Sequence, residues 1–250
     1  MPVSEYNKEL FLDACNKIVQ NGNNQNGIGT LKEKTLHAVL KNFYEPDTSR
    51  QEVKVGRFVA DIKKDNEIIE IQTRSFNNMR KKLAQFLELY HVTIVYPIIY
   101  NKWLYWINEE TGEISPGRKS PKHGSFYDAF YELYKIKPYL ASPNLDICLT
   151  LVDAKEYRIL NGYGKDHKKG STRYDRIPVA LVDELCIKNQ SGYLSLLPVN
   201  LPSKFSVKDY AKQAHINNRY AQLAINIFKY IGIIEQSGKD GRSYLYSRKI

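Results

Sequence analysis

Residues 92–99 form an almost uninterrupted apolar run, Val-Thr-Ile-Val-Tyr-Pro-Ile-Ile. A run of this kind, without alternation of polar and apolar side chains, is typical of a strand buried on both faces of a sheet. Three shorter strand-like segments precede it, at residues 52–56, 57–63 and 67–74. Helical spacing of apolar residues surrounds them, at residues 4–20, from Thr30 towards Pro46, and at 77–90. This order of elements predicts an α/β domain with a mixed central sheet flanked by helices.

Two of the predicted strands carry acidic side chains into otherwise apolar stretches. Asp61 lies in the first, and Glu70 and Gln72 alternate with isoleucines in the second. If these strands pair as a hairpin through the polar turn at residues 63–66, Asp61 and Glu70 converge on one face. Burying two unneutralised carboxylates side by side is costly, so the pattern predicts either a shared divalent cation or protonation. The alternative is an ordinary pair of solvent-facing strand residues.

Charge and composition restrict the classes of partner. The chain has 250 residues, 42% of them hydrophobic, and a net charge of +10, which favours a polyanionic partner such as nucleic acid. No run approaches the roughly 18 apolar residues needed to cross a bilayer, and no secretory signal is evident, so we expect a cytoplasmic protein with no membrane partner. We expect the scattered cysteines to be reduced, buried thiols: Cys15, Cys148 and Cys186.

The final 50 residues have a pattern of their own. Residues 198–202 are expected to be a linker, which divides the chain into domains at residues 1–197 and 203–250. A short helix is predicted from Ser206, a longer one at 219–231, and a hairpin with a glycine-containing turn at 237–242. Residues 201–250 contain nine Lys/Arg and three Asp/Glu, so this segment contributes 9 − 3 = +6 to the net charge.

The segment between residues 100 and 200 gives a weaker pattern. It predicts a hairpin at 103–114, a helix at 125–134, a strand at 146–152 and a basic loop at 162–176. Basic side chains of this loop are expected to contact a DNA backbone, with a solvated surface as the alternative: Lys168, Lys169 and Arg173.

The combination of Glu33 on a helix, Asp61 on a strand and Glu70-Ile71-Gln72 on the next strand resembles the PD-(D/E)XK nuclease superfamily, over about residues 28–100. The resemblance implies a restriction-endonuclease-like fold and phosphodiester hydrolysis that depends on Mg²⁺, for which Mn²⁺ can substitute. It implies that Asp61, Glu70 and Glu33 are metal ligands. Glu33 is also the third residue after Thr30 in a capping-box pattern, which explains it without catalysis.

Gln72 departs from the superfamily pattern, because a lysine that stabilises phosphate charge usually stands at that position. A glutamine can orient the attacking water by hydrogen bonding, but it supplies no positive charge. We expect Lys63, two residues beyond Asp61, or Arg74, two residues beyond Gln72, to provide that charge. Under this hypothesis, Lys63→Ala lowers cleavage far more than Lys64→Ala does.

Residues 203–248 resemble a winged helix-turn-helix module. In such modules the second helix enters the major groove and the wing touches phosphate or the minor groove. The resemblance implies DNA contacts by residues of that helix and of the wing: Asn217, Asn218, Arg219, Tyr220, Gln222, Lys239 and Arg242. The excess positive charge of the segment favours nucleic acid over a protein-binding winged helix.

Together these patterns predict a metal-dependent DNA endonuclease that a winged helix targets to double-stranded DNA, in restriction, defence or DNA mobility. Because cutting both strands commonly requires two active sites, the hypothesis is compatible with a homodimer. The rival hypothesis is a DNA-binding regulator whose nuclease-like domain is catalytically inactive, and Gln72 is the residue that favours it. A third hypothesis is binding or cleavage of RNA.

Overall fold

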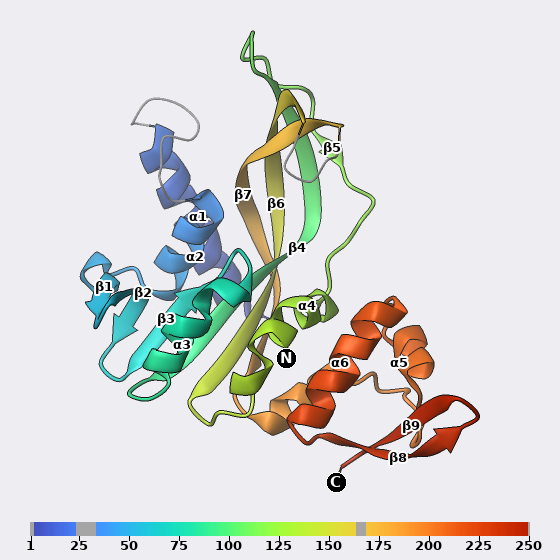
Figure 1. Cartoon of the computed structure of the whole chain (residues 1–250). Coiled ribbons are helices and arrows are strands. Elements are labelled where there is room, and N and C mark those ends of the chain that lie inside the picture. The colour runs from blue at the N-terminus through green and yellow to red at the C-terminus, as the bar shows by residue number, and fades with distance from the viewer. Residues whose placement is uncertain (1–2, 24–33, 164–168, 250) are drawn as a thin grey trace. The chain divides into compact units, whose positions relative to one another are not determined.

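The computed structural model describes residues 3–23, 34–163 and 169–249 (Figure 1). Within these residues seven strands form one sheet, with the order β1-β2-β3-β4-β6-β7 and with β5 paired to β4. The strands are β1 (Gln51–Val55), β2 (Phe58–Lys64), β3 (Glu67–Ile71), β4 (His91–Asn108), β5 (Arg118–Lys119), β6 (Leu145–Tyr163) and β7 (Lys169–Ile187). Because β2 and β3 are antiparallel and β3 and β4 are parallel, the sheet is mixed, and the predicted α/β class is confirmed.

The α-helices of the described residues are α1 (Glu5–Asn23), α2 (Thr35–Tyr44), α3 (Arg80–Phe86), α4 (Phe130–Leu133), α5 (Val207–Gln213) and α6 (Asn218–Tyr230). The chain divides into two compact units, and the long strands β4, β6 and β7 contribute residues to both. The first unit contains Met1–Val53, Pro97–Ser125 and Thr150–Glu184. The second contains Lys54–Tyr96, Phe126–Leu149 and Leu185–Ile250.

The second unit contains the two acidic strands. Strands β2 and β3 form the expected antiparallel hairpin, with Ile62 opposite Ile69 and Lys64 opposite Glu67. A 3₁₀ turn (Phe76–Met79) and α3 then connect β3 to the parallel strand β4, as a parallel pair requires a crossover. Val92 and Ile94 are fully buried, which confirms that the apolar run begins as an interior strand.

The C-terminal part of the second unit contains α5, α6 and an antiparallel hairpin of β8 (Ile234–Asp240) and β9 (Ser243–Arg248). Ser206 caps α5 in a reciprocal capping box with Asp209, which fixes where this helix begins. Aromatic edge-to-face contacts join α4, α5 and α6, and Phe130, Tyr210 and Phe228 are fully buried there. The predicted helices and hairpin are therefore present, and α6 and α5 share a core with α4.

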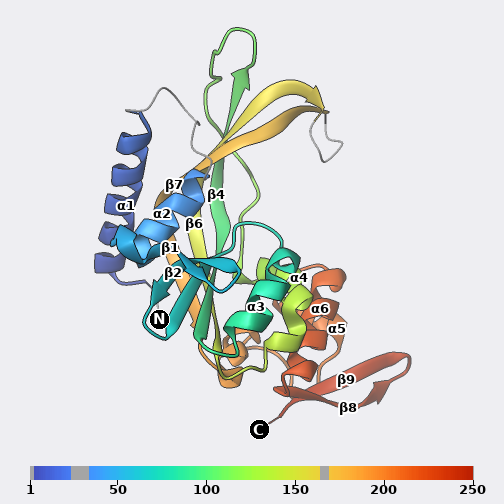
Figure 2. The same cartoon turned by 60° about the vertical axis from the view of Figure 1, so that its left-hand side comes forward.

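In the first unit, β4, β6 and β7 extend much farther than the sequence pattern predicts (Figures 1 and 2). Strand β4 continues to Asn108, so the expected hairpin at 103–114 is the end of this strand, with a bridge from Ile107 to Ile114. Residues 169–176, expected in a basic loop, belong to β7, whereas residues 164–168 lie outside the described part. Pairing with β6 makes this segment a strand.

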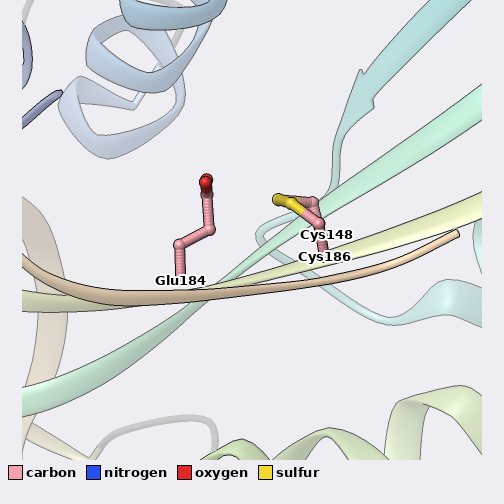
Figure 3. A group of neighbouring side chains, drawn as sticks. All are labelled: Cys148, Glu184 and Cys186. Carbon is pink, nitrogen blue, oxygen red and sulfur yellow. A yellow bond between two sulfur atoms is a disulfide. The ribbon is translucent and has the colours of Figure 1, made fainter. Parts of the chain in front are cut away.

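Two further expectations need correction or lie outside the described residues. Helix α2 begins at Thr35, with Lys34 at its N-cap and no side-chain cap, and Thr30 and Glu33 are outside the described part. Cys148 of β6 and Cys186 of β7 form a disulfide, shown with Glu184 in Figure 3, because neighbouring strands bring them together across 38 positions. The prediction of reduced thiols was wrong for this pair.

Cys15 is a free, buried cysteine, as predicted, and burial raises the pKa of its thiol to about 12. In the described part of the chain, no helix is both long and apolar enough to span a membrane.

Candidate active site

Asp61 and Glu70 face each other across the β2–β3 hairpin. Ile62 pairs with Ile69, and one further step of this antiparallel register places Asp61 opposite Glu70. Directly opposed residues share one face of a sheet. The backbone amide of Asp61 donates to Glu70 Oε1 at 3.3 Å, and Asp61 Oδ2 accepts from the backbone amide of Ile71 at 2.7 Å. The structure therefore brings the two carboxylates together.

Glu70 is the strongly perturbed member of the pair. It is only 5% exposed, and burial together with the negative charge of Asp61 raises the pKa of its carboxyl group to about 7, against an ordinary value of 4.5. Lys82 opposes this shift. A carboxyl group that titrates near neutral pH, beside a second acid, marks a candidate functional site.

Lys82 of α3 completes this group. Its Nζ donates to Glu70 Oε2 at 2.5 Å, and its side chain is 17% exposed. The same ammonium group lies 5.6 Å from the centre of the Phe86 ring. The site therefore combines two acids from adjacent strands with one cation from the crossover helix.

Lys82 was not among the predicted site residues, because α3 begins with three consecutive basic residues and no motif distinguishes one of them. Lys82 follows Met79 by three positions and precedes Phe86 by four, so it lies on the same helical face as these two buried residues. Arg80 and Lys81 are exposed. The spacing of Lys82 from the apolar residues Met79 and Phe86 is therefore the sequence signal that separates it from Arg80 and Lys81.

The other predicted site residues lie in different surroundings. Lys63 Nζ donates to the carbonyl oxygen of Asp65 at 3.0 Å and lies 5.4 Å from the centre of the Tyr90 ring, so Lys82 and not Lys63 is the lysine beside Glu70. Gln72 is half-buried, and its backbone amide donates to Val95, which extends the β3–β4 pairing by one residue. Gln72 Oε1 accepts from the amide of Arg74, which is exposed. Glu33 is outside the described residues.

The carboxylate oxygens of Asp61 and Glu70 suit a hard divalent cation. Mg²⁺ prefers oxygen ligands, keeps several waters and is commonly held by one or two carboxylates together with substrate phosphate. Asp61 and Glu70 supply carboxylates from adjacent strands, and a cation would relieve the repulsion that helps to raise the pKa of Glu70. These two residues therefore fit a Mg²⁺ or Mn²⁺ site.

The raised pKa of Glu70 predicts a stability effect that is separate from activity. Because the folded-state pKa of about 7 exceeds the ordinary 4.5, folding binds an additional proton between these values, and the free energy of unfolding falls as pH rises from 4.5 to 7. Asp61→Asn removes part of the cause and keeps an oxygen for the Ile71 amide. We expect it to raise the free energy of unfolding by about 1 kcal/mol at pH 8.

This gain should shrink as pH falls through 7, since Glu70 then becomes protonated and the repulsion disappears. Urea unfolding at several pH values measures the effect. The matched control is Asp65→Asn in the exposed turn of the same hairpin, where no comparable gain is expected. An Asp61→Asn protein that is less stable than the parent at pH 8 would contradict the assignment of the repulsion.

Most of the predicted DNA-contacting residues of the C-terminal segment are exposed, at the start of α6 and on the hairpin. Asn217 caps α6 by accepting from the amide of Tyr220, which is half-buried. The guanidinium group of Arg219 lies 5.8 Å from the centre of the Tyr131 ring. The remaining residues are exposed, namely Asn218, Gln222, Lys239 and Arg242.

The basic residues expected in the loop after β6 are only partly described. Lys168 lies outside the described residues, and Lys169 begins β7, with a side chain that is not described. Arg173 is an exposed residue of β7 in the first unit.

The matched family spans the centre of the chain. Residues 34–188, more than half of the sequence, match the model described as Domain of unknown function (DUF8091). The chain belongs to this family. The DUF8091 match contains Asp61, Glu70 and Lys82, and it ends before the C-terminal helices and hairpin.

A protein of Treponema pallidum (strain Nichols), described as an uncharacterized protein, is 27% identical over 229 residues. The similarity covers 89% of this chain and 88% of that relative, so it extends beyond the DUF8091 region. No solved structure matches this chain.

Proposed function

We propose that this protein is a Mg²⁺-dependent DNA endonuclease of the PD-(D/E)XK type, in which Asp61 and Glu70 hold the metal. The observation that supports this proposal best is the opposed pair of acids on β2 and β3, one of them buried with its pKa raised to about 7, with Lys82 at its side. A buried charge cluster of this kind is costly to maintain and is typical of a catalytic site.

In this proposal, Lys82 takes the role of the lysine that the superfamily usually has at the position of Gln72. The metal, when bound, acidifies a water molecule and neutralises phosphate charge. Lys82 adds a positive charge and hydrogen-bond donors that stabilise the charge developing on the scissile phosphate. Gln72 orients the attacking water through its carboxamide group. Glu70 must be ionised to bind metal, and the charge of Lys82 favours that form.

We further propose that residues 203–248 form a winged helix that binds duplex DNA. Two helices followed by an antiparallel hairpin support this proposal, as do the exposed polar start of α6 and the exposed Lys239 and Arg242. Residues 203–248 carry eight Lys/Arg and three Asp/Glu, which suits a polyanion.

A catalytically inactive DNA-binding regulator is the second candidate. It is favoured by the fact that both acids have hydrogen-bond donors within the protein: Lys82 donates to Glu70, and the Ile71 amide donates to Asp61. In that case, Gln72 stands where an active ancestor had the catalytic lysine.

Incubation of the purified protein with supercoiled plasmid distinguishes the two candidates. The nuclease proposal predicts nicked and linear products with Mg²⁺ or Mn²⁺, and intact plasmid when a chelator removes the metal. Tight binding to duplex DNA, with no product under any of these conditions, would instead support the regulator. Preferential cleavage of structured RNA would contradict the choice of substrate.

A further inference from the structure

Glu156, in the first unit, is a buried acid surrounded by an excess of cations. It lies on β6 and is 1% exposed. Its Oε1 accepts from Arg158 Nη1 at 2.9 Å and its Oε2 accepts from Arg176 Nε at 2.7 Å. Lys102 Nζ lies 3.8 Å from Oε1. Burial alone would raise the pKa of Glu156, but the neighbouring positive charges, above all that of Arg176, hold it below its ordinary value.

The cations outnumber the acid that they surround. Lys102, Arg158 and Arg176 form what we call the cationic face, and one Glu156 carboxylate leaves this group with an excess of 3 − 1 = +2. Burial lowers the pKa of Lys102, and the positive charges of Arg176, Arg158 and Arg173 lower it further. One cation neutralises one carboxylate, so charge balance within the fold does not explain three.

The arginines of this face are held in position. Arg158 Nε donates to Ser171 Oγ at 3.0 Å and its Nη2 donates to the Ser171 carbonyl oxygen at 3.3 Å, in addition to its bond to Glu156. Arg176 is fixed through Nε, and its terminal nitrogens make no hydrogen bond to the described part of the chain. The Arg158 and Arg176 side chains remain 25% and 27% exposed. Arginine forks that are oriented in advance suit phosphate oxygens.

We propose that the cationic face binds the phosphate backbone of duplex DNA. Its residues come from the adjacent strands β4, β6 and β7. Three strands at the usual spacing span about 10 Å, which is more than one phosphate fills. Duplex DNA carries one charge per about 1.7 Å of its axis, so it presents several phosphates over that distance. This inference rests on the proposed function for the choice of DNA, but it concerns binding and not the hydrolytic site.

Fluorescence anisotropy with a labelled DNA duplex tests the proposal on the full-length protein. The measurement is made without divalent metal, so that binding is read independently of cleavage. Arg176→Gln is expected to weaken binding about three- to ten-fold and to reduce the slope of log K against log salt by about 1. Lys102→Gln is a second variant less prone to misfolding, because Lys102 lies beyond hydrogen-bond distance from Glu156. It should also weaken binding.

Lys155→Gln is the matched control. Lys155 is exposed, carries the same charge and precedes Glu156 by one position, so strand alternation places it on the opposite face of β6. The proposal is overturned if folded Arg176→Gln and Lys102→Gln proteins bind DNA as Lys155→Gln does, or if an RNA duplex of the same sequence binds more tightly. Plasmid cleavage by the same proteins is measured separately. If the parent cleaves DNA and the two variants bind DNA as the parent does, only this inference is rejected. If the two variants bind more weakly and no protein cleaves, only the nuclease proposal is rejected.

Discussion

Asp61→Asn is expected to lower metal-dependent plasmid cleavage by at least about a thousand-fold, because the loss of a metal ligand removes several kcal/mol of transition-state stabilisation. The substitution keeps the size of the side chain and an oxygen that can accept from the Ile71 amide. It removes the charge that a divalent cation requires. Initial rates of nicking, measured with saturating Mg²⁺ and again with Mn²⁺, give the loss directly.

Asp65→Asn is the control for this experiment. Asp65 lies in the turn of the same hairpin, four positions later, and is exposed with a positive φ of 42°, a conformation that asparagine adopts readily. We expect its cleavage rate to match that of the parent. If Asp61→Asn cleaves as fast as Asp65→Asn, Asp61 is not a metal ligand. If Asp61→Asn loses activity and has a higher free energy of unfolding at pH 8, Asp61 contributes to function while it lowers the stability of the fold.

Lys82→Gln is expected to lower cleavage about a hundred-fold or more, the usual cost of removing one preorganised donor to developing negative charge. The charge of Lys82 also lowers the pKa of Glu70, so its removal should raise that pKa above 7. The rising limb of the pH–rate profile should therefore move to higher pH. A lysine with a purely structural role would change the melting temperature without moving this profile.

Lys81→Gln provides the matched control, since Lys81 is the adjacent residue of α3 and is exposed. Lys63→Ala tests which lysine supplies the positive charge: Lys63, which the sequence predicted, or Lys82, which lies beside Glu70. Lys63 is bonded to Asp65 and lies against Tyr90, so its removal should have a much smaller effect than that of Lys82. A Lys63→Ala protein that is as impaired as Lys82→Gln would reject the role given to Lys82.

The acidic pair could be anticipated from sequence because its geometry depends on two local rules. Side chains alternate along a strand, and a short polar turn joins neighbouring antiparallel strands. Together these rules place Asp61 opposite Glu70. The buried start of β4, the capped helix α5 and the C-terminal hairpin were also predictable, since each has a local signal of apolar periodicity or turn residues.

The features that sequence reasoning missed depend on contacts between distant segments. Lys82 reaches Glu70 only because α3 is rotated so that its Met79 and Phe86 face is buried. Residues 169–176 of β7 form a strand because β6 pairs with them, although these residues are polar and basic enough to suggest a loop. The same pairing joins Cys148 to Cys186 and places the arginines of β6 and β7 around Glu156.

Anomalous diffraction from crystals soaked in Mn²⁺ tests the central claim most directly, because it locates the metal without reference to activity. The proposal predicts a peak within about 2.0–2.2 Å of one oxygen of Asp61 and one of Glu70, with Lys82 moved away from Glu70 Oε2 to make room. It also predicts that the peak is absent in Asp61→Asn crystals. A map with no peak at these carboxylates, at saturating Mn²⁺ and above pH 7, would contradict the claim.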